Sequence, residues 1–186
     1  MLLLVGLGNP GSNYTNTRHN IGFKIIDAIN THFKLSKQKP KFKGLLTTGN
    51  IDEKKIYAIK PLTFMNNSGT AIKELIDYFK IDAKDVIVFH DDMDIDFGKI
   101  KAKFGGSSAG HNGIESIDKF IGKDYSRVRI GIGKPKNGIE VADFVLQNFD
   151  EDESLKIEKI LENINGSLSI LVEKKLDLFS STVNNK

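Results

Sequence analysis

Three of the four histidines in this sequence lie in polar segments bounded by glycine, a local composition typical of active sites. They are His19, His90 and His111. An imidazole titrates near neutral pH, so it can take a proton from water while a carboxylate holds its tautomer and stabilises the resulting cation. Because the chain has no cysteine, a thiolate nucleophile is excluded. The residue types therefore indicate hydrolysis by a histidine and aspartate pair, with asparagine amides around it.

The composition indicates a globular chain with one core. Of its 186 residues, 39% are hydrophobic and 27% are charged, which suits a single domain over residues 1–186. No apolar run approaches the ~20 residues that cross a bilayer. The run at 2–5 lacks a basic leader, so it predicts a buried strand and not a signal peptide. Without cysteine there are no disulfides or thiolate metal sites, and a cytoplasmic location is the default expectation.

Short apolar runs alternate with helical patterns along the chain. Strands are expected at 2–7, 44–49, 55–60, 86–90 and 127–132, and helices at 20–33, 67–79, 111–121 and 150–168. This alternation predicts an α/β fold: a single-domain three-layer sandwich in which helices flank a mixed, mostly parallel twisted sheet. The acidic residues 150–153 suit a helix N-terminus, and the tail at 183–186 is expected to be frayed.

Lysines gather in two segments, although the formal net charge is only +3. One segment covers residues 34–43. In the other, Lys99, Lys101 and Lys103 alternate with apolar residues, which in a strand would place three ammonium groups on one face. Such a row could be a solvated edge strand or a row of phosphate contacts, and the residues leave both readings open.

Three short patterns suggest other functions but lack the necessary context. Residues 6–11 fit G-x-G-x-x-G, yet a polar loop follows them where a dinucleotide site needs a helix. Residues 106–110 fit G-x-S-x-G, yet no histidine follows His111, so the Ser, acid, His order of α/β-hydrolases is missing. Residues 92–96 begin like a calcium loop without its glycine and glutamate. The acidic run beside His90 could still bind a hard divalent ion.

Four polar segments remain, and each is expected where a strand ends and the chain turns toward a helix. Ligands bind at that edge of open α/β sheets. The segments are 8–19, 60–69, 90–94 and 105–113. Together they supply a base, several acids and three amide side chains.

Six motifs resemble those of the bacterial peptidyl-tRNA hydrolase family and occur in the family's order. They are G-L-G-N-P-G-x-x-Y-x-x-T-R-H-N-x-G-F (6–23), K-P-x-T-F-M-N-x-S-G (60–69), H-D-D-x-D (90–94), G-G-x-x-G-H-N-G (105–113), R-x-R-I-G-I-G-x-P (127–135) and F-V-L-x-x-F (144–149). The resemblance implies a monomeric, cytoplasmic α/β enzyme without metal or organic cofactor. Its implied reaction is cleavage of the ester between a peptide and the 3′-terminal ribose of tRNA, which recycles tRNA from stalled peptidyl-tRNA.

The resemblance also assigns roles to individual residues. His19 matches the catalytic base, and Asp91 matches the carboxylate that supports it. Asn9 matches the position that discriminates peptidyl from free aminoacyl substrates. The other matches are expected to bind substrate or tRNA: Tyr14, Phe64, Met65, Asn66, Lys103, His111, Asn112 and Arg129. The chain departs from the family pattern at Met93 and at 107–108, which bears only on the mobility of the loop over the site.

Each assignment has a structural alternative when the resemblance is set aside. Asn66 could cap the helix that begins beside it. Tyr14, Phe64 and Met65 could be packing residues, and His111 could serve only to shape its loop.

Two other functions compete with hydrolysis of peptidyl-tRNA. RNA-binding factors of this fold keep the tRNA-binding face without hydrolysis, but the chain retains His19, Asp91 and the three asparagines. A general esterase could use the same pair on small esters. The lysine row and Arg129 favour a polyanionic substrate instead.

Overall fold

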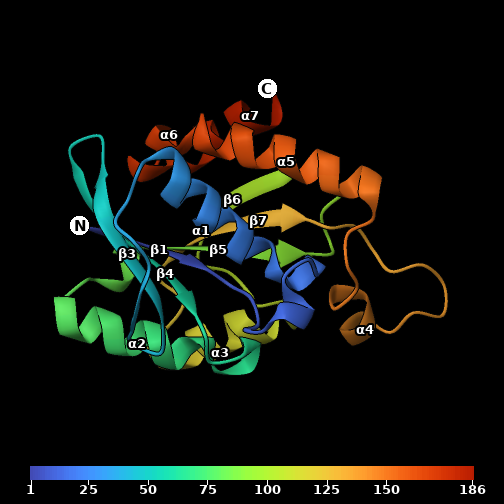
Figure 1. Ribbon diagram of the computed structural model, residues 1–186, viewed down its shortest axis with the longest axis horizontal. Helices are drawn as coiled ribbons and strands as arrows, with labels where there is room; N and C mark the ends of the chain where they lie inside the picture. The colour runs from blue at the N-terminus through green and yellow to red at the C-terminus, as the bar shows by residue number, and fades with distance from the viewer.

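The computed structural model describes all residues, 1–186, and shows one twisted sheet with helices on both faces (Figure 1). From one edge to the other, the strands are β2 (Lys39–Lys41), β3 (Gly44–Ile51), β4 (Lys54–Pro61), β1 (Leu2–Gly6), β5 (Val86–Asp92), β7 (Ser126–Gly131) and β6 (Ile100–Phe104). The four central strands, β4, β1, β5 and β7, are parallel, and the three at the edges are antiparallel to their neighbours. The expected α/β sandwich with a mixed sheet is confirmed.

Seven α-helices connect and cover these strands. They are α1 (Ile21–His32), α2 (Ser68–Phe79), α3 (Asn112–Ile121), α4 (Val141–Val145), α5 (Glu151–Asn165), α6 (Leu168–Val172) and α7 (Leu176–Asn184). Short 3₁₀ turns form at η1 (Ser12–Tyr14), η2 (Arg18–Asn20), η3 (Met65–Asn67) and η4 (Ala83–Asp85). None of the helices combines the length and apolar composition needed to cross a bilayer.

Both faces of the sheet are buried, which explains why its central strands read as continuous apolar runs. In β1, Leu2 and Leu4 join the core shared with α1, α5, α6 and α7. Leu3 and Val5 point the other way and pack with α2 and α3. The two cores make the three layers that Figure 1 shows.

Two expectations about the elements need correction, and one strand was not expected. The helix expected over 150–168 ends at Asn165, because Gly166 and Ser167 are poor helix formers, and Leu168 starts a separate buried helix. The tail is not frayed throughout, since Val183 is buried and α7 extends to Asn184. Strand β2 is an additional element that apolar patterning does not signal, because its sequence is Lys-Pro-Lys.

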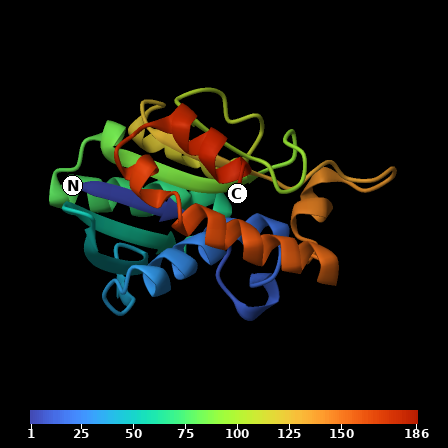
Figure 2. The ribbon, with the colours of Figure 1, turned by 90° about the horizontal axis from the view of Figure 1, so that it is seen from above.

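Helix α7 covers the open edge of the sheet at β6 (Figure 2). The amide of Asn184 accepts from the N–H of Ile100 at 2.9 Å and donates to its carbonyl at 2.7 Å. The hydroxyl of Ser180 accepts from the N–H of Ala102 at 2.9 Å. These side chains pair backbone groups that an edge strand otherwise leaves unpaired.

Helix α1 begins in direct contact with the strands that precede the site. A Cβ atom on Gly22 would lie 2.3 Å from the backbone N of Leu7 and 2.5 Å from the carbonyl O of Phe89. Only glycine permits this approach. The turn η2, which carries His19, is thereby held beside the end of β5.

Arg18 ties the turn η2 to the C-terminal third of the chain. Its buried guanidinium donates to the carbonyls of Gln147 and Asn148, at 3.2 and 2.8 Å, and to both carboxylate oxygens of Glu153, at 3.1 and 3.0 Å. Glu153 also completes a capping box with Asp150 at the start of α5, where the acidic run predicted a helix N-terminus.

Removing the carboxylate of Glu153 should destabilise the fold, because Arg18 would keep a buried charge without its partner. Glu153→Ala should lower the free energy of unfolding by about 3 kcal/mol. Glu153→Gln should lower it less, since an amide oxygen can still accept from Arg18 and from the backbone of Asp150. Urea unfolding at pH 7 measures both, with Glu151→Ala as the control in the same helical turn. Equal effects of Glu153→Ala and Glu151→Ala would show that the ion pair contributes nothing.

Candidate active site

Three of the four predicted segments meet at one edge of the sheet, the carboxyl ends of β1, β4 and β5 (Figure 1). The fourth does not follow the expected path. Because β6 is antiparallel to β7, with Phe104 opposite Ser126, the chain leaves β6 at the other end of the sheet. The loop at 105–111 then runs back along the sheet to bring His111 to the active edge. Strand β6 therefore leads away from the site, contrary to expectation.

The carboxylate of Asp91 forms the centre of the site. It is 3% exposed, at the end of β5, and both of its oxygens lie 2.9 Å from Nδ1 of His19. Its Oδ1 also lies 2.9 Å from Nε2 of His111. One buried acid thus joins two histidines from distant parts of the chain, as the motifs predict for His19 and Asp91.

The hydrogen bonds fix the tautomers of both histidines. Nδ1 of His111 accepts from the N–H groups of Gly113 and Ile114, at 3.1 and 3.3 Å, and so caps the N-terminus of α3. Its proton must therefore be on Nε2, which donates to Asp91. Since an ionised carboxylate only accepts, Nδ1 of His19 also carries a proton. In the neutral imidazole, Nε2 of His19 is then the nitrogen with a free lone pair.

The environment keeps Asp91 ionised. Burial opposes the charged form, but the charges and hydrogen bonds of His19 and His111 outweigh burial and lower the pKa of the Asp91 carboxyl. An ionised carboxylate in this position can stabilise an imidazolium at His19.

Ligand atoms of His19, Asp91 and His111 lie within 4.8 Å of one another, so the cluster has the composition of a metal site. The hydrogen bonds argue against that use, because metal ligation requires deprotonated nitrogens and both nitrogens facing Asp91 carry protons. The neighbouring acidic residues are also poorly placed to bind a metal ion. Asp92 already accepts from Nε of Arg129 and from the N–H of Asp94, both at 2.9 Å.

Asn9 presents a hydrogen-bond donor to the site. Its Oδ1 accepts from the N–H of Met65 at 2.8 Å, which leaves its NH₂ group as the free end. The side chain of Asn20 brackets the backbone of Asn9, accepting from its N–H at 2.8 Å and donating to its carbonyl at 2.9 Å. Sequence reasoning missed Asn20, although it follows His19 within the first motif.

The turn before α2 is strained at Phe64, whose φ is +60°. This conformation is uncommon for residues other than glycine and clusters at functional sites. It leaves the Phe64 side chain 52% exposed, ahead of the buried Met65 that contacts Asn9 through its backbone. Phe64 is therefore not a core residue, whereas the side chain of Met65 is one.

The two other predicted asparagines lie on the turns that begin helices. Asn66 is exposed in η3 and does not cap α2, because the residue before that helix is Asn67. Asn112 is the exposed first residue of α3, next to His111. Tyr14 is half-buried in η1.

Lys103 and Arg129 meet in a small hollow of about 80 Å³ beneath the loop at 105–111. Its lining also includes His90, Asp92, Ser107, Ser108, Ala109 and Arg127. Burial and the charges of Arg129 and Arg127 lower the pKa of Lys103. The hollow is thus a concentration of positive charge on the α3 face of the sheet.

Arg127 holds the loop over this hollow, a role that sequence reasoning missed. It donates to the carbonyl of Ser107 and to Asp118, both at 2.8 Å. Tyr125 donates to the same carboxylate at 2.8 Å, and burial together with that hydrogen bond raises the pKa of its hydroxyl. The only signal in the sequence is the first arginine of the R-x-R motif.

The fold and the site define an α/β enzyme of the hydrolase class, with a histidine hydrogen-bonded to a buried aspartate. The sequence profile of the peptidyl-tRNA hydrolase family matches residues 3–186, and the chain belongs to that family. The peptidyl-tRNA hydrolase of Pelagibacter ubique (strain HTCC1062) is 75% identical over 186 residues, the whole of both chains. That of Bacillus subtilis (strain 168) is 45% identical over 163 residues, 87% of each chain. The crystal structure of peptidyl-tRNA hydrolase from Acinetobacter baumannii is similar with a TM-score of 0.92 and 32% identity, over 99% of this chain and 94% of that one.

The buried His90 should make the stability of the fold depend on pH. Burial, with the nearby His111, lowers the pKa of His90 to about 3. Below pH 6.5, His90 therefore binds a proton in the unfolded chain but not in the folded chain. The free energy of unfolding falls as the pH falls. Between pH 6.5 and 4.5 the free energy of unfolding should drop by about 2–3 kcal/mol relative to His90→Asn, which removes this proton.

Urea titrations across this range measure the difference, and His32→Asn controls for the loss of an exposed imidazole. A constant difference between the wild type and His90→Asn would show that His90 is protonated equally in both states.

Proposed function

We propose that this chain hydrolyses the ester between a peptide and the 3′-terminal ribose of tRNA, with His19 as general base and Asp91 as its supporting carboxylate. The observation that carries the proposal is the hydrogen bonding at Asp91, which occupies Nδ1 of His19 and leaves Nε2 as the nitrogen available to take a proton. Membership of the peptidyl-tRNA hydrolase family supports the choice of substrate.

The proposed reaction needs only these side chains and water. His19 takes a proton from a water molecule whose oxygen forms a bond to the ester carbonyl carbon. The tetrahedral intermediate then collapses, the bond to the ribose oxygen breaks, and the imidazolium returns its proton to that oxygen. Asp91 stabilises the imidazolium throughout. General base catalysis of this kind contributes about 10²–10⁴-fold to the rate.

The asparagines provide the proposed substrate contacts. Asn9 offers only its NH₂ group, so it is suited to a carbonyl oxygen, such as that of the peptide bond beside the ester. A free aminoacyl group has an ammonium there instead and gives Asn9 no acceptor. Asn66 and Asn112, exposed on the turns before and at the start of their helices, are proposed to bind the substrate on either side.

The proposed contacts with tRNA lie outside the pair of His19 and Asp91. Tyr14 and Phe64 can stack on the bases or ribose of the 3′ end, and Lys103 and Arg129 can bind phosphate in their shared hollow. We also propose that the chain works as a monomer, as one domain, in the cytoplasm where tRNA is found. His111 is proposed to serve the site by orienting Asp91.

Removing the base should abolish turnover while leaving tRNA bound. His19→Ala should lower kcat on N-acetyl-aminoacyl-tRNA by about 10²–10⁴-fold, because the imidazole acts in the transition state while phosphate contacts supply the affinity. Turnover and tRNA binding are measured on the same preparation, with His32→Ala as the control histidine. Near-normal turnover would discard the mechanism.

Replacing the donor of Asn9 should weaken the selection for blocked substrates. In Asn9→Asp one oxygen can still accept from Met65, but the other presents negative charge where the NH₂ group was. The ratio of kcat/KM for N-acetyl-aminoacyl-tRNA to that for aminoacyl-tRNA should fall at least about tenfold, equivalent to ~1.4 kcal/mol. Asn13→Asp adds the same charge to the exposed turn η1 as a control. An equal fall in kcat/KM for both substrates would show that another residue discriminates between them.

A further inference from the structure

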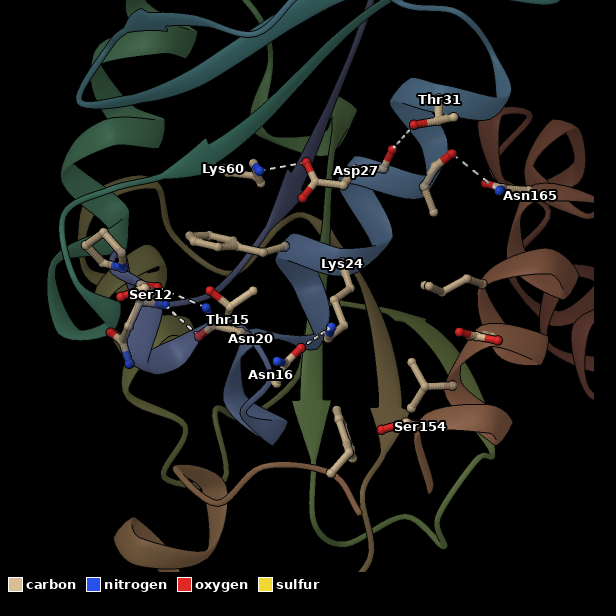
Figure 3. A pocket seen from close by; sticks show the side chains of 18 of the residues that line it. Ser12, Thr15, Asn16, Asn20, Lys24, Asp27, Thr31, Lys60, Ser154 and Asn165 are labelled. Carbon is tan, nitrogen blue, oxygen red and sulfur yellow. Dashed lines mark hydrogen bonds and ion pairs between the residues drawn. The ribbon is translucent and has the colours of Figure 1, made fainter. Parts of the chain in front are cut away.

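An open groove of about 1100 Å³ runs along helix α1, on the face of the sheet opposite the hollow of Lys103 (Figure 3). Its walls are the loop at 9–16, helix α1, the end of β4 and helix α5. Figure 3 shows that side chains from all four enter it, among them those of Ser12, Lys24, Lys60 and Ser154. Apart from Asn9 and Asn20 at one end, the residues that line the groove have no role in the proposed reaction.

One end of the groove opens at the site. Asn9 and Asn20 line that end, and Asn20 directly follows the base His19. Asn9 is the residue whose free NH₂ group is proposed above to bind the carbonyl beside the ester. The other end reaches Thr31 and Asn165, at the C-termini of α1 and α5. A substrate bound at His19 and Asp91 can therefore extend into the groove.

The charges of the groove do not suit nucleic acid. Lys60 is neutralised by Asp27 at 2.6 Å, and Lys24 donates to the amide of Asn16 at 3.0 Å. The acidic side chains Glu158 and Glu162 line the α5 wall. Phosphates would be repelled by Glu158 and Glu162, whereas the hollow on the other face of the sheet gathers the positive charges of Lys103, Arg127 and Arg129.

We propose that this groove binds the peptide part of the substrate in an extended conformation. The inference rests on the proposed function, since it needs a substrate with a peptide on one side of the ester and RNA on the other. The peptide and the RNA then extend from the site along opposite faces of the sheet. The amides, hydroxyls and paired charges of the walls offer hydrogen bonds to a peptide backbone without requiring particular side chains.

The length of the groove sets the number of residues bound. Helix α1 has twelve residues and is about 18 Å long at 1.5 Å per residue. An extended chain advances about 3.4 Å per residue, so the groove holds about five residues counted back from the ester. Thr15 lies near the site and Thr31 lies at the far end.

Filling the far end should affect only long peptides. Thr31→Trp should lower kcat/KM for N-acetyl-hexapeptidyl-tRNA about three- to tenfold, the loss of one or two hydrogen bonds, through KM. The effect should not extend to N-acetyl-aminoacyl-tRNA, whose single residue stops at the near end. Ser181→Trp is the matched control, because Ser181, like Thr31, is exposed on a helix with its hydroxyl bonded to a carbonyl of the preceding turn.

A labelling experiment measures the same geometry without a bulky substitution. The chain has no cysteine, so Thr31→Cys, Thr15→Cys and Ser181→Cys each supply one thiol. In a His19→Ala background, peptidyl-tRNA with an N-terminal iodoacetyl group remains intact, and the bound thiolate displaces iodide to form a thioether. Thr31→Cys should be labelled by peptides of about five residues and not by one residue. Thr15→Cys should show the reverse order, and Ser181→Cys should stay unlabelled.

The outcomes separate the inference from the proposed function. Length-dependent loss in Thr31→Trp, together with length-ordered labelling, supports the groove as the peptide site. Equal loss on long and short substrates, no loss on either, or labelling independent of length overturns it. Hydrolysis of N-acetyl-aminoacyl-tRNA by the wild type tests the function alone, because that substrate does not need the groove.

Discussion

The site depends on one buried carboxylate that accepts hydrogen bonds from two imidazoles. Asp91 is the penultimate residue of the central strand β5, so the pairing of that strand with β7 fixes its backbone. The rest of the structure brings its partners to it: Gly22 lets helix α1 approach closely enough for His19, and the loop at 105–111 returns along the sheet with His111. Since Nδ1 of His111 also accepts from the first backbone N–H groups of α3, this cap orients Nε2 toward Asp91. A change in any of these elements would alter the position of His19 through Asp91.

Each of the three consecutive residues of η2 contacts a different part of the chain. Arg18 holds the turn against the C-terminal segments and Glu153. His19 contacts Asp91, and Asn20 fixes the backbone of Asn9. A 3₁₀ turn suits this use, because three residues per turn direct consecutive side chains about 120° apart. His19 is thus held from both sides by its own neighbours.

Much of this could be predicted from the sequence, because residue type and spacing record local chemistry. The motifs identify the histidine and aspartate that the structure brings together, and apolar periodicity places most of the elements to within a few residues. The sequence does not show in which direction a strand runs or which distant groups a side chain contacts. The antiparallel course of β6 follows from packing against β7, and the roles of Asn20 and Arg127 depend on backbone groups distant in sequence. A histidine that caps a helix is equally hidden, since caps are usually Ser, Thr, Asp or Asn.

The covering of β6 by α7 has a consequence during synthesis. Ser180 and Ala102 are 78 residues apart, and at ~5–20 residues per second the ribosome needs about 4–16 s to make the chain between them. During that interval the strand is complete but its outer hydrogen-bonding groups have no partner, so it can pair with the edges of other nascent chains. The last helix therefore ends a period of exposure to aggregation, and C-terminal truncation would extend that period for the lifetime of the protein.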